Sequence, residues 1–325
     1  MMLHRRRAER KKAKLRLGLS GPAGSGKTIA SLLIAYGLCK DWGKITLVDT
    51  ENGSGDLYVN HIIKQNGKEI KIGVYNVITL NAPYEPEKYI RAIEICEEAG
   101  DAVVILDSAT HAWAGKGGLL EDHGKITDTS SSGNSWAAWR KVTPRHNAFV
   151  EKMLTCHLHL IATLRAKTEY VQDKNPDGNT IIKKVGLNPI QRDGMEFEFT
   201  AFFDLSQNHN ASCSKDRSSL FDGKIWLPDI ETGEIFLDWL DSGVDIDPEE
   251  EARKEKERYL SAKAEEAKIK EIRELAKQKG WDSKIAKEKL RQITKRTTTA
   301  SLTNEEADKF IKYLNLKGDE KEGMV

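Results

Sequence analysis

The stretch Gly21-Pro22-Ala23-Gly24-Ser25-Gly26-Lys27-Thr28 decides the fold that we expect for this chain. It matches G-x-x-x-x-G-K-[ST], the P-loop pattern, in which glycines let backbone N–H groups turn inward around phosphates. Residues 15–19 before it alternate like a strand, and residues 29–39 after it are typical of a buried helix. This strand–loop–helix order is the setting that the pattern requires. The sequence therefore predicts that these eight residues bind the phosphates of a nucleoside triphosphate.

Two side chains at the end of the loop have separate predicted roles. Lys27 is expected to reach the β- and γ-phosphates, and the Thr28 hydroxyl is expected to ligate Mg²⁺. The helix that begins there adds the positive end of its dipole. A glycine-rich turn without a ligand is the alternative, and the strand and helix around the motif disfavour it.

An apolar run that ends in a carboxylate provides a second motif, Ala102-Val103-Val104-Ile105-Leu106-Asp107. Its continuous hydrophobicity is typical of a parallel strand covered on both faces, and its form is that of a Walker B strand. Asp107 is therefore expected to hold Mg²⁺, directly or through water. The alternative is a buried strand that merely ends at a polar turn.

Residues 44–49 form another predicted strand and lead into Thr50-Glu51-Asn52-Gly53. Acidic side chains at the carboxyl end of a strand lie where open α/β sheets bind ligands. Here the chain resembles the RecA/recombinase branch of P-loop ATPases, in which a glutamate in a phrase like Val48-Asp49-Thr50-Glu51 activates the attacking water. The pair Asp107-Ser108 also resembles the Walker B ending of that family. The resemblance implies that Glu51 is the catalytic base; a solvated acid or a contact to the ribose is the alternative.

The predicted strand 158–163 is followed by Leu164-Arg165-Ala166-Lys167. In the RecA family the equivalent strand ends in a sensor of the γ-phosphate and enters a DNA-binding loop. The resemblance puts Thr163 at the sensor position, where the family usually has glutamine. Arg165 or Lys167 is expected to stabilise transition-state charge, in its own site or in that of a neighbouring subunit. A solvated or DNA-backbone role for both residues is the alternative.

The layout from Lys14 to about Leu240 also resembles a family of AAA ATPases found mostly in bacteriophage genomes, some of them associated with single-strand annealing and recombination. This resemblance implies an α/β fold of RecA-like type, with a mostly parallel sheet flanked by helices. It also implies ATP and Mg²⁺ as cofactors, a homo-oligomer, and the cytoplasm of a bacterial host as the location. ATP is favoured over GTP because the sequence lacks an N-K-x-D motif.

Single-stranded DNA is the expected partner, bound through local patches because the formal net charge is only +1. Two segments, 116–135 and 165–194, are predicted to be irregular and lie where RecA-like proteins carry DNA-contacting loops. In the second, Asn175-Pro176-Asp177-Gly178 is a predicted hairpin turn, and Tyr170 offers a surface for base stacking. The candidates for phosphate contacts are Lys167, Lys174, Lys183, Lys184 and Arg192. A solvated, lysine-rich hairpin is the alternative.

Composition divides the chain into four predicted parts. Residues 1–14 form a basic arm that either binds DNA phosphates or solubilises the chain, and residues 15–240 form the ATPase domain. Residues 241–265 have the pattern of a charged helical linker. Residues 266–325 are predicted to form a small helical module, with a capping box at Thr303-Asn304-Glu305-Glu306. This module is the candidate site for a protein partner.

Cysteine and histidine spacing gives little support for a second kind of metal site. The four cysteines are scattered, as is usual for reduced thiols of a cytosolic protein. Zinc is an alternative at Cys156-His157-Leu158-His159, where the two histidines would share one face of a strand, and at His209 with Cys213; the lack of a C-x-x-C pair disfavours it. No apolar run reaches the roughly 18 residues that a membrane span requires.

Together these features predict a Mg²⁺-dependent ATPase in phage-type DNA recombination or annealing, which binds single-stranded DNA according to its nucleotide state. One alternative is an ATP switch or assembly factor that controls a protein partner without binding DNA. Another is a small-molecule phosphotransferase, which the lack of an arginine-rich lid disfavours.

Overall fold

The computed structural model describes residues 7–65, 67–129, 133–174, 180–244, 253, 257, 266–299 and 302–316. For residues 168–174 and 180–187 it describes the backbone. Contacts divide the chain into two units, Arg10–Val244 on one side and Met1–Glu9 with Asp245–Val325 on the other. Within the described ranges, no helix combines the length and the apolarity that a bilayer span requires.

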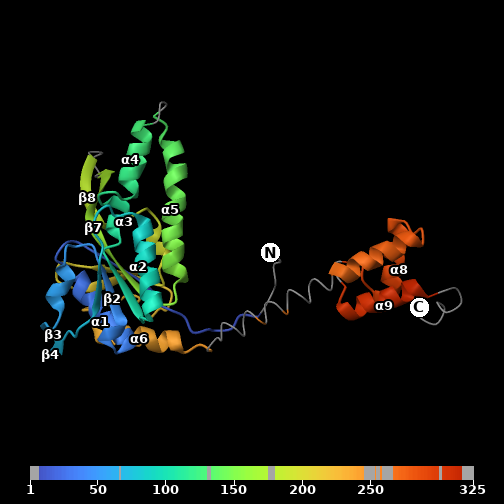
Figure 1. The fold of residues 1–325 in the computed structure, drawn as a ribbon, viewed down its shortest axis with the longest axis horizontal. Coiled ribbons are helices and arrows are strands. Elements are labelled where there is room, and N and C mark those ends of the chain that lie inside the picture. The colour runs from blue at the N-terminus through green and yellow to red at the C-terminus, as the bar shows by residue number, and fades with distance from the viewer. Residues whose placement is uncertain are drawn as a thin grey trace. The chain divides into compact units, whose positions relative to one another are not determined.

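One mixed sheet organises the larger unit, with helices packed around it (Figure 1). The strand order of this sheet is β11-β10-β9-β1-β7-β6-β2-β5. The six strands from β9 to β5 are parallel, and β10 and β11 extend the sheet with antiparallel pairs. The strands are β1 (Arg16–Gly21), β2 (Ile45–Asp49), β5 (Asn76–Thr79), β6 (Val103–Asp107), β7 (His159–Lys174), β9 (Ala201–Leu205), β10 (Ala211–Asp216) and β11 (Ile225–Trp226). With the helices described below, this sheet confirms the predicted α/β fold, in which a mostly parallel sheet is flanked by helices.

Helices cover both faces of the sheet, so side chains along each strand alternate between two apolar cores. In β6, Val103 and Ile105 enter one core, whereas Val104 and Leu106 enter the other. The first core lies under α1 (Lys27–Cys39) and α6 (Ile230–Asp241); the second lies under α2 (Pro86–Ala99), α3 (Thr110–Ala114) and α5 (Ser135–Thr155). The predicted burial of the Walker B strand on both faces is therefore correct.

A glycine pair brings two helices of the first core close together. A Cβ atom on Gly37 of α1 would lie 2.2 Å from the carbonyl oxygen of Ile230 and 2.8 Å from the Cα of Gly233 in α6. Neither distance leaves room for a side chain. The backbones of α1 and α6 are therefore in direct contact at this point.

The amino-terminal segment of the larger unit is tied to its last residue. The amide of Lys12 donates to the carbonyl of Val244 at 3.1 Å, and the amide of Val244 donates to the carbonyl of Arg10 at 2.9 Å. The Arg10 guanidinium also donates to the Trp239 carbonyl at 2.8 Å and lies 5.3 Å from the centre of its ring. From Arg10 onward, the predicted basic arm therefore packs against the domain.

Two predicted irregular segments have regular structure. Residues 116–135 include α4 (Leu119–Thr129), which forms because Leu119 is buried in a small core with Trp113 and Val142. In the segment 165–194, β7 continues to Lys174 and pairs antiparallel with β8 (Thr180–Pro189). The predicted turn at residues 175–178 lies outside the described residues.

Shorter elements complete the larger unit. A separate antiparallel hairpin consists of β3 (Ile62–Gln65) and β4 (Lys68–Lys71). Three short 3₁₀ helices are η1 (Trp42–Lys44), η2 (Ser54–Tyr58) and η3 (Met195–Glu198). The helix η3 lies shortly before β9 in the chain and leaves Phe197 exposed.

The smaller unit contains a helix over residues 266–278, α8 (Ser283–Thr294) and α9 (Asn304–Asn315). These helices share an apolar core that includes Ile272, Leu290 and Phe310. The predicted capping box is present at the start of α9, where Thr303 and Glu306 each accept the other's backbone N–H.

Candidate nucleotide-binding site

The loop between β1 and α1 has the backbone shape that the P-loop pattern predicts. Gly24 and Gly26 have φ angles of 79° and 84°, in the left-handed region that favours glycine. A Cβ atom on Gly21 would lie 2.8 Å from the carbonyl oxygen of Leu205. Among the described residues, no side chain caps the N-terminus of α1. The first N–H groups of this helix are therefore left for an anion.

Lys27 lies across the loop that contains it. Its ammonium donates to the carbonyl oxygens of Gly21 at 2.9 Å and Pro22 at 2.8 Å. Burial lowers the pKa of Lys27, and the nearby carboxylate of Asp107 acts in the opposite direction. Because a phosphate is a stronger acceptor than a carbonyl, the ammonium is well placed for an anionic ligand of the loop.

Asp107 joins three elements through its two carboxylate oxygens. Oδ2 accepts from the Thr28 hydroxyl at 2.6 Å, and Oδ1 accepts from the Thr163 hydroxyl at 2.5 Å. The carboxylate is 3% exposed, and burial raises the pKa of Asp107 above its usual range. The two predicted ligands of Mg²⁺ are thus in contact, and the predicted sensor touches the same carboxylate.

Glu51 and Arg165 form a bidentate ion pair at the same edge of the sheet. Arg165 Nε donates to Glu51 Oε1 at 3.0 Å, and Nη2 donates to Glu51 Oε2. The backbone N–H of Glu51 donates to the buried carboxylate of Asp49 at 2.6 Å, which fixes the loop after β2. The charges of Glu51 and Arg165 both act on Lys27. The structure therefore brings together the four residues predicted to be catalytic.

A family model described as "AAA domain" matches residues 13–267. The chain belongs to the AAA domain family. The matched range includes every predicted nucleotide and metal contact of this AAA domain.

Comparisons with individual proteins add little to the family assignment. Among solved structures, the chain is similar to the crystal structure of the RadB recombinase, with 16% sequence identity and a TM-score of 0.31. The alignment covers 65% of this chain and 84% of that chain. No curated protein matches the chain.

Thr50 is a site residue of the AAA domain that the sequence did not single out. Its hydroxyl accepts from the amide of Ser108 at 2.8 Å and lies 2.7 Å from His111 Nδ1. Its own amide donates to the carbonyl of Asp107 at 2.8 Å. Thr50 thereby ties the loop that carries Glu51 to the end of β6.

The turn between β9 and β10 covers another side of the P-loop. Gln207 Nε2 donates to the carbonyl of Ala23 at 3.3 Å. A Cβ atom on Gly26 would lie 3.0 Å from His209 Nδ1, so the imidazole lies directly against this glycine. No motif in the sequence marks Gln207 or His209 as neighbours of the loop.

The β7–β8 hairpin extends β7 beyond the carboxyl edge of the sheet, where the P-loop lies. In Figure 1 it projects toward the same end of the domain as α4 and α5. Lys167 is exposed and Arg192 is half-buried. The backbone register puts Tyr170 opposite Lys184. The side chains of the other DNA candidates, Tyr170, Lys174, Lys183 and Lys184, lie outside those that the structure describes.

The zinc alternative is not supported by the positions of the two histidines. His159 is buried, and its Nδ1 accepts the amide of Leu15 at 3.1 Å. His157 is exposed and precedes β7, so the two rings do not share a strand face.

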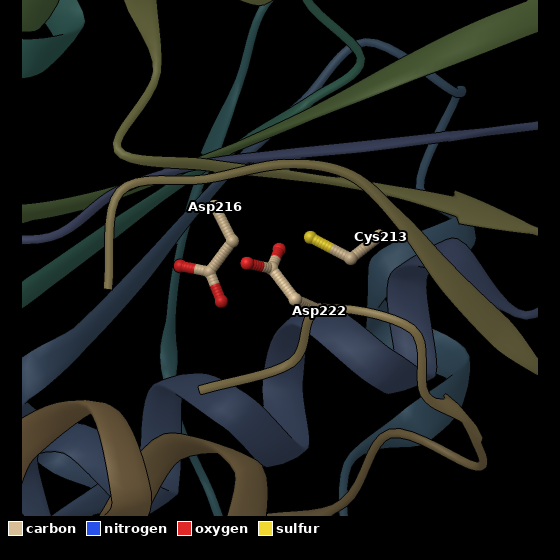
Figure 2. Close-up of side chains that lie close together, drawn as sticks. All are labelled: Cys213, Asp216 and Asp222. Carbon is tan, nitrogen blue, oxygen red and sulfur yellow. The ribbon is translucent and has the colours of Figure 1, made fainter. Parts of the chain in front are cut away.

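A different group of metal-ligand types is shown in Figure 2: Cys213, Asp216 and Asp222, with ligand atoms within 4.8 Å of one another. The carboxylate of Asp216 already accepts the amides of Ser218 at 2.7 Å and Phe221 at 2.8 Å. Burial, together with the charge of Asp216, raises the pKa of Cys213 to about 11. Because the Asp216 carboxylate already binds the backbone of its own turn, we assign no metal to this cluster.

Proposed function

We propose that this AAA domain protein is a Mg²⁺-dependent ATPase that binds single-stranded DNA in recombination or annealing of the phage type. The contact of Thr28 and Thr163 with the buried carboxylate of Asp107, beside Lys27, carries the proposal. Hydroxyl and carboxylate oxygens are the ligands that Mg²⁺ prefers. Within the described part of the chain, the buried hydroxyls of Ser25 and Ser108 have no hydrogen-bond partner, which favours a polar ligand here.

The residues of the site have complementary roles in this proposal. The N–H groups of the P-loop and Lys27 bind the phosphates, and Thr28 and Asp107 would hold Mg²⁺. Bound Mg²⁺ neutralises charge on the β- and γ-phosphate oxygens. Glu51 orients a water molecule in line with the γ-phosphate and accepts its proton. Thr163 holds Asp107 in place through its hydroxyl.

Arg165 links the proposed chemistry to the proposed DNA surface. While Arg165 is paired with Glu51, the carboxylate is not free to accept a proton from water. If the guanidinium moves to the γ-phosphate, it releases the base and adds positive charge where negative charge develops. Arg165 belongs to β7, which continues into the β7–β8 hairpin, so DNA on the hairpin is well placed to influence this pair.

The proposal also includes a homo-oligomer, a protein partner for the carboxyl-terminal helices and, if the chain is phage-encoded, the cytoplasm of the bacterial host. The fold class and the family are compatible with each of these. The ion pair of Arg165 is formed within one chain, so a role for this residue in a neighbouring subunit requires the pair to open.

ATP hydrolysis with and without single-stranded DNA tests the proposal, with Lys27→Ala as the blank. We expect hydrolysis that requires Mg²⁺, that DNA stimulates and that the Lys27 variant lacks. Hydrolysis that is indifferent to DNA would support an ATP switch acting on a protein partner. Transfer of phosphate to an added small molecule would instead support a phosphotransferase.

A further inference from the structure

A pocket of about 350 Å³ lies beside the P-loop, apart from the residues that the proposed hydrolysis uses. Its walls are Gly26, Ile29 and Ala30 at the start of α1, His209, residues 61–65 and the pair Leu227-Pro228. Its volume is within the range of small-molecule sites, and its lining is largely apolar. Nothing in the proposed chemistry of the phosphates accounts for it.

The sheet order gives the direction in which a bound triphosphate would run. β1 has β7 on one side and β9 on the other. Thr163 and Arg165 belong to β7, and Asp107 lies beyond it on β6, so the γ-phosphate end faces that side. The N–H groups of a P-loop bind the α- and β-phosphates. The first turn of α1 follows directly after these N–H groups in the chain. The nucleoside therefore leaves the loop along the first turn of α1, on the β9 side, where Gly26, Ile29 and Ala30 line the pocket.

We propose that this pocket holds the base and ribose of the nucleotide, and that His209 is its stacking residue. This inference rests on the proposed binding of ATP to the P-loop. His209 has a φ angle of 65°, and its amide donates to the Ser206 carbonyl at 3.0 Å, which fixes the turn that carries it. Gln207 fastens the same turn to Ala23. The imidazole is thereby held against Gly26 at the entrance of the pocket.

The opposite wall is fastened by one side chain. Gln65 at the end of β3 donates from Nε2 to the carbonyl of Pro228 at 2.8 Å. This contact joins the β3–β4 hairpin to the segment after β11, and Ile62, Ile63 and Leu227 line the space between them. Flat apolar walls of this kind suit the faces of a base, and the imidazole provides an aromatic surface on the other side.

Calorimetric binding of two ligands to the full chain tests the inference: MgATP, and magnesium tripolyphosphate, which has the phosphates without the nucleoside. We expect His209→Ala to weaken binding of MgATP about tenfold, as for the loss of one stacking interaction, and to leave tripolyphosphate unchanged. Leu227→Trp, which fills the pocket from another element, should have the same selective effect. The matched control is His157→Ala at an exposed histidine, which should change neither affinity.

The outcomes separate this inference from the proposed function. Lys27→Ala should weaken both ligands, because it acts on the phosphates. Suppose that the wild type binds both MgATP and tripolyphosphate. If the His209 and Leu227 variants then have unchanged affinities, or affinities weakened equally for the two ligands, the pocket does not hold the nucleoside. If the wild type binds neither ligand, ATP binding fails and the inference fails with it.

Discussion

Asp107 is a residue whose proposed function conflicts with the stability of the domain. Its carboxylate is buried, and burial raises its pKa, which means that the folded state disfavours the ionised form. Two hydroxyls, from Thr28 and Thr163, partly offset this effect of burial. A bound cation would offset it further, which is a reason to find such a carboxylate at a metal site.

The first prediction concerns Asp107→Asn. We expect ATP hydrolysis to fall by about 100-fold, since the cation loses a charged ligand. We expect the nucleotide-free protein to be at least as stable as the wild type, because a neutral amide is less costly to bury. Hydrolysis assays and thermal unfolding without nucleotide measure the two effects. A clear loss of stability would show that the charge of Asp107 stabilises the fold.

The second prediction concerns Glu51→Gln. The amide keeps the shape of the side chain but cannot accept a proton, so hydrolysis should fall by about 10²- to 10⁴-fold. Binding of MgATP should remain, because Glu51 is not among the predicted phosphate contacts. Equal hydrolysis rates in the variant and the wild type would remove Glu51 from the role of base.

The third prediction concerns the pH dependence of stability at His159. Burial lowers the pKa of His159 to about 3, and its Nδ1 accepts the amide of Leu15. As the pH falls below about 6.5, the unfolded chain binds a proton that the folded chain does not, so stability decreases down to pH 3. The loss from this residue should reach about 2 kcal/mol at pH 5.

His159→Asn provides the comparison, because an amide oxygen can accept from Leu15 without titrating. Urea unfolding at pH 7 and pH 5 measures both proteins. We expect the wild type to lose about 2 kcal/mol more than the variant between these pH values. The same loss in both would assign the pH dependence to other groups.

At the residue scale, motif spacing located the loop, Lys27 and Asp107 because it reflects a fixed local backbone. It gave no indication of Thr50 or His209. Thr50 acts through its contact with the end of β6, and His209 reaches Gly26 through the pairing of β9 with β1. Both depend on which strands become neighbours, and a single sequence does not state this.

Among the elements, α1 and α6 make a close backbone contact through Gly37 and Gly233. The fourth prediction is that Gly37→Ala destabilises the domain by about 1–3 kcal/mol, because the added methyl group meets backbone atoms. The matched control is Gly124→Ala in α4, where a Cβ atom meets nothing within 4 Å. There alanine should stabilise by about 1 kcal/mol through helix propensity. Chemical unfolding of both variants distinguishes close packing from a general effect of replacing glycine.

The elements also show why composition was a poor guide between the core strands. The segment 116–135 is rich in Gly, Ser and Thr, yet α4 forms within it because Leu119 gains a buried position beside Trp113. Tertiary packing here outweighs propensity. The same holds for β7, whose pairing with β8 continues far beyond the sheet.

At the scale of the whole molecule, the net charge of +1 means that the proposed DNA binding depends on local groups. The fifth prediction is that Lys183→Ala with Lys184→Ala weakens binding of single-stranded DNA. The salt dependence of binding should fall by about 0.7 for each DNA phosphate that the variant no longer neutralises. Hydrolysis without DNA should not change. The control is the double variant Lys68→Ala with Lys71→Ala, on the β3–β4 hairpin. If both double variants weaken DNA binding equally, the effect comes from net charge and not from a specific surface on the β7–β8 hairpin.

The order of the strands is the part of the whole fold that the sequence revealed least. Alternation and apolar runs located β1, β2, β6 and β7 one by one. β7 lies between β1 and β6, and no local pattern in the sequence reports which strands become neighbours. The two separate units are consistent with the change of composition near residue 245.

The pairing of residues 10–12 with Val244 means that the chain enters and leaves the larger unit at a single point. The two ends of the larger unit are therefore adjacent in space. A linker of a few residues between these ends would allow circular permutation of the unit. The new termini could then lie in a surface loop without changing any strand pairing. For the same reason, the unit is suited to insertion into another protein, because both of its ends could join a single loop of the host.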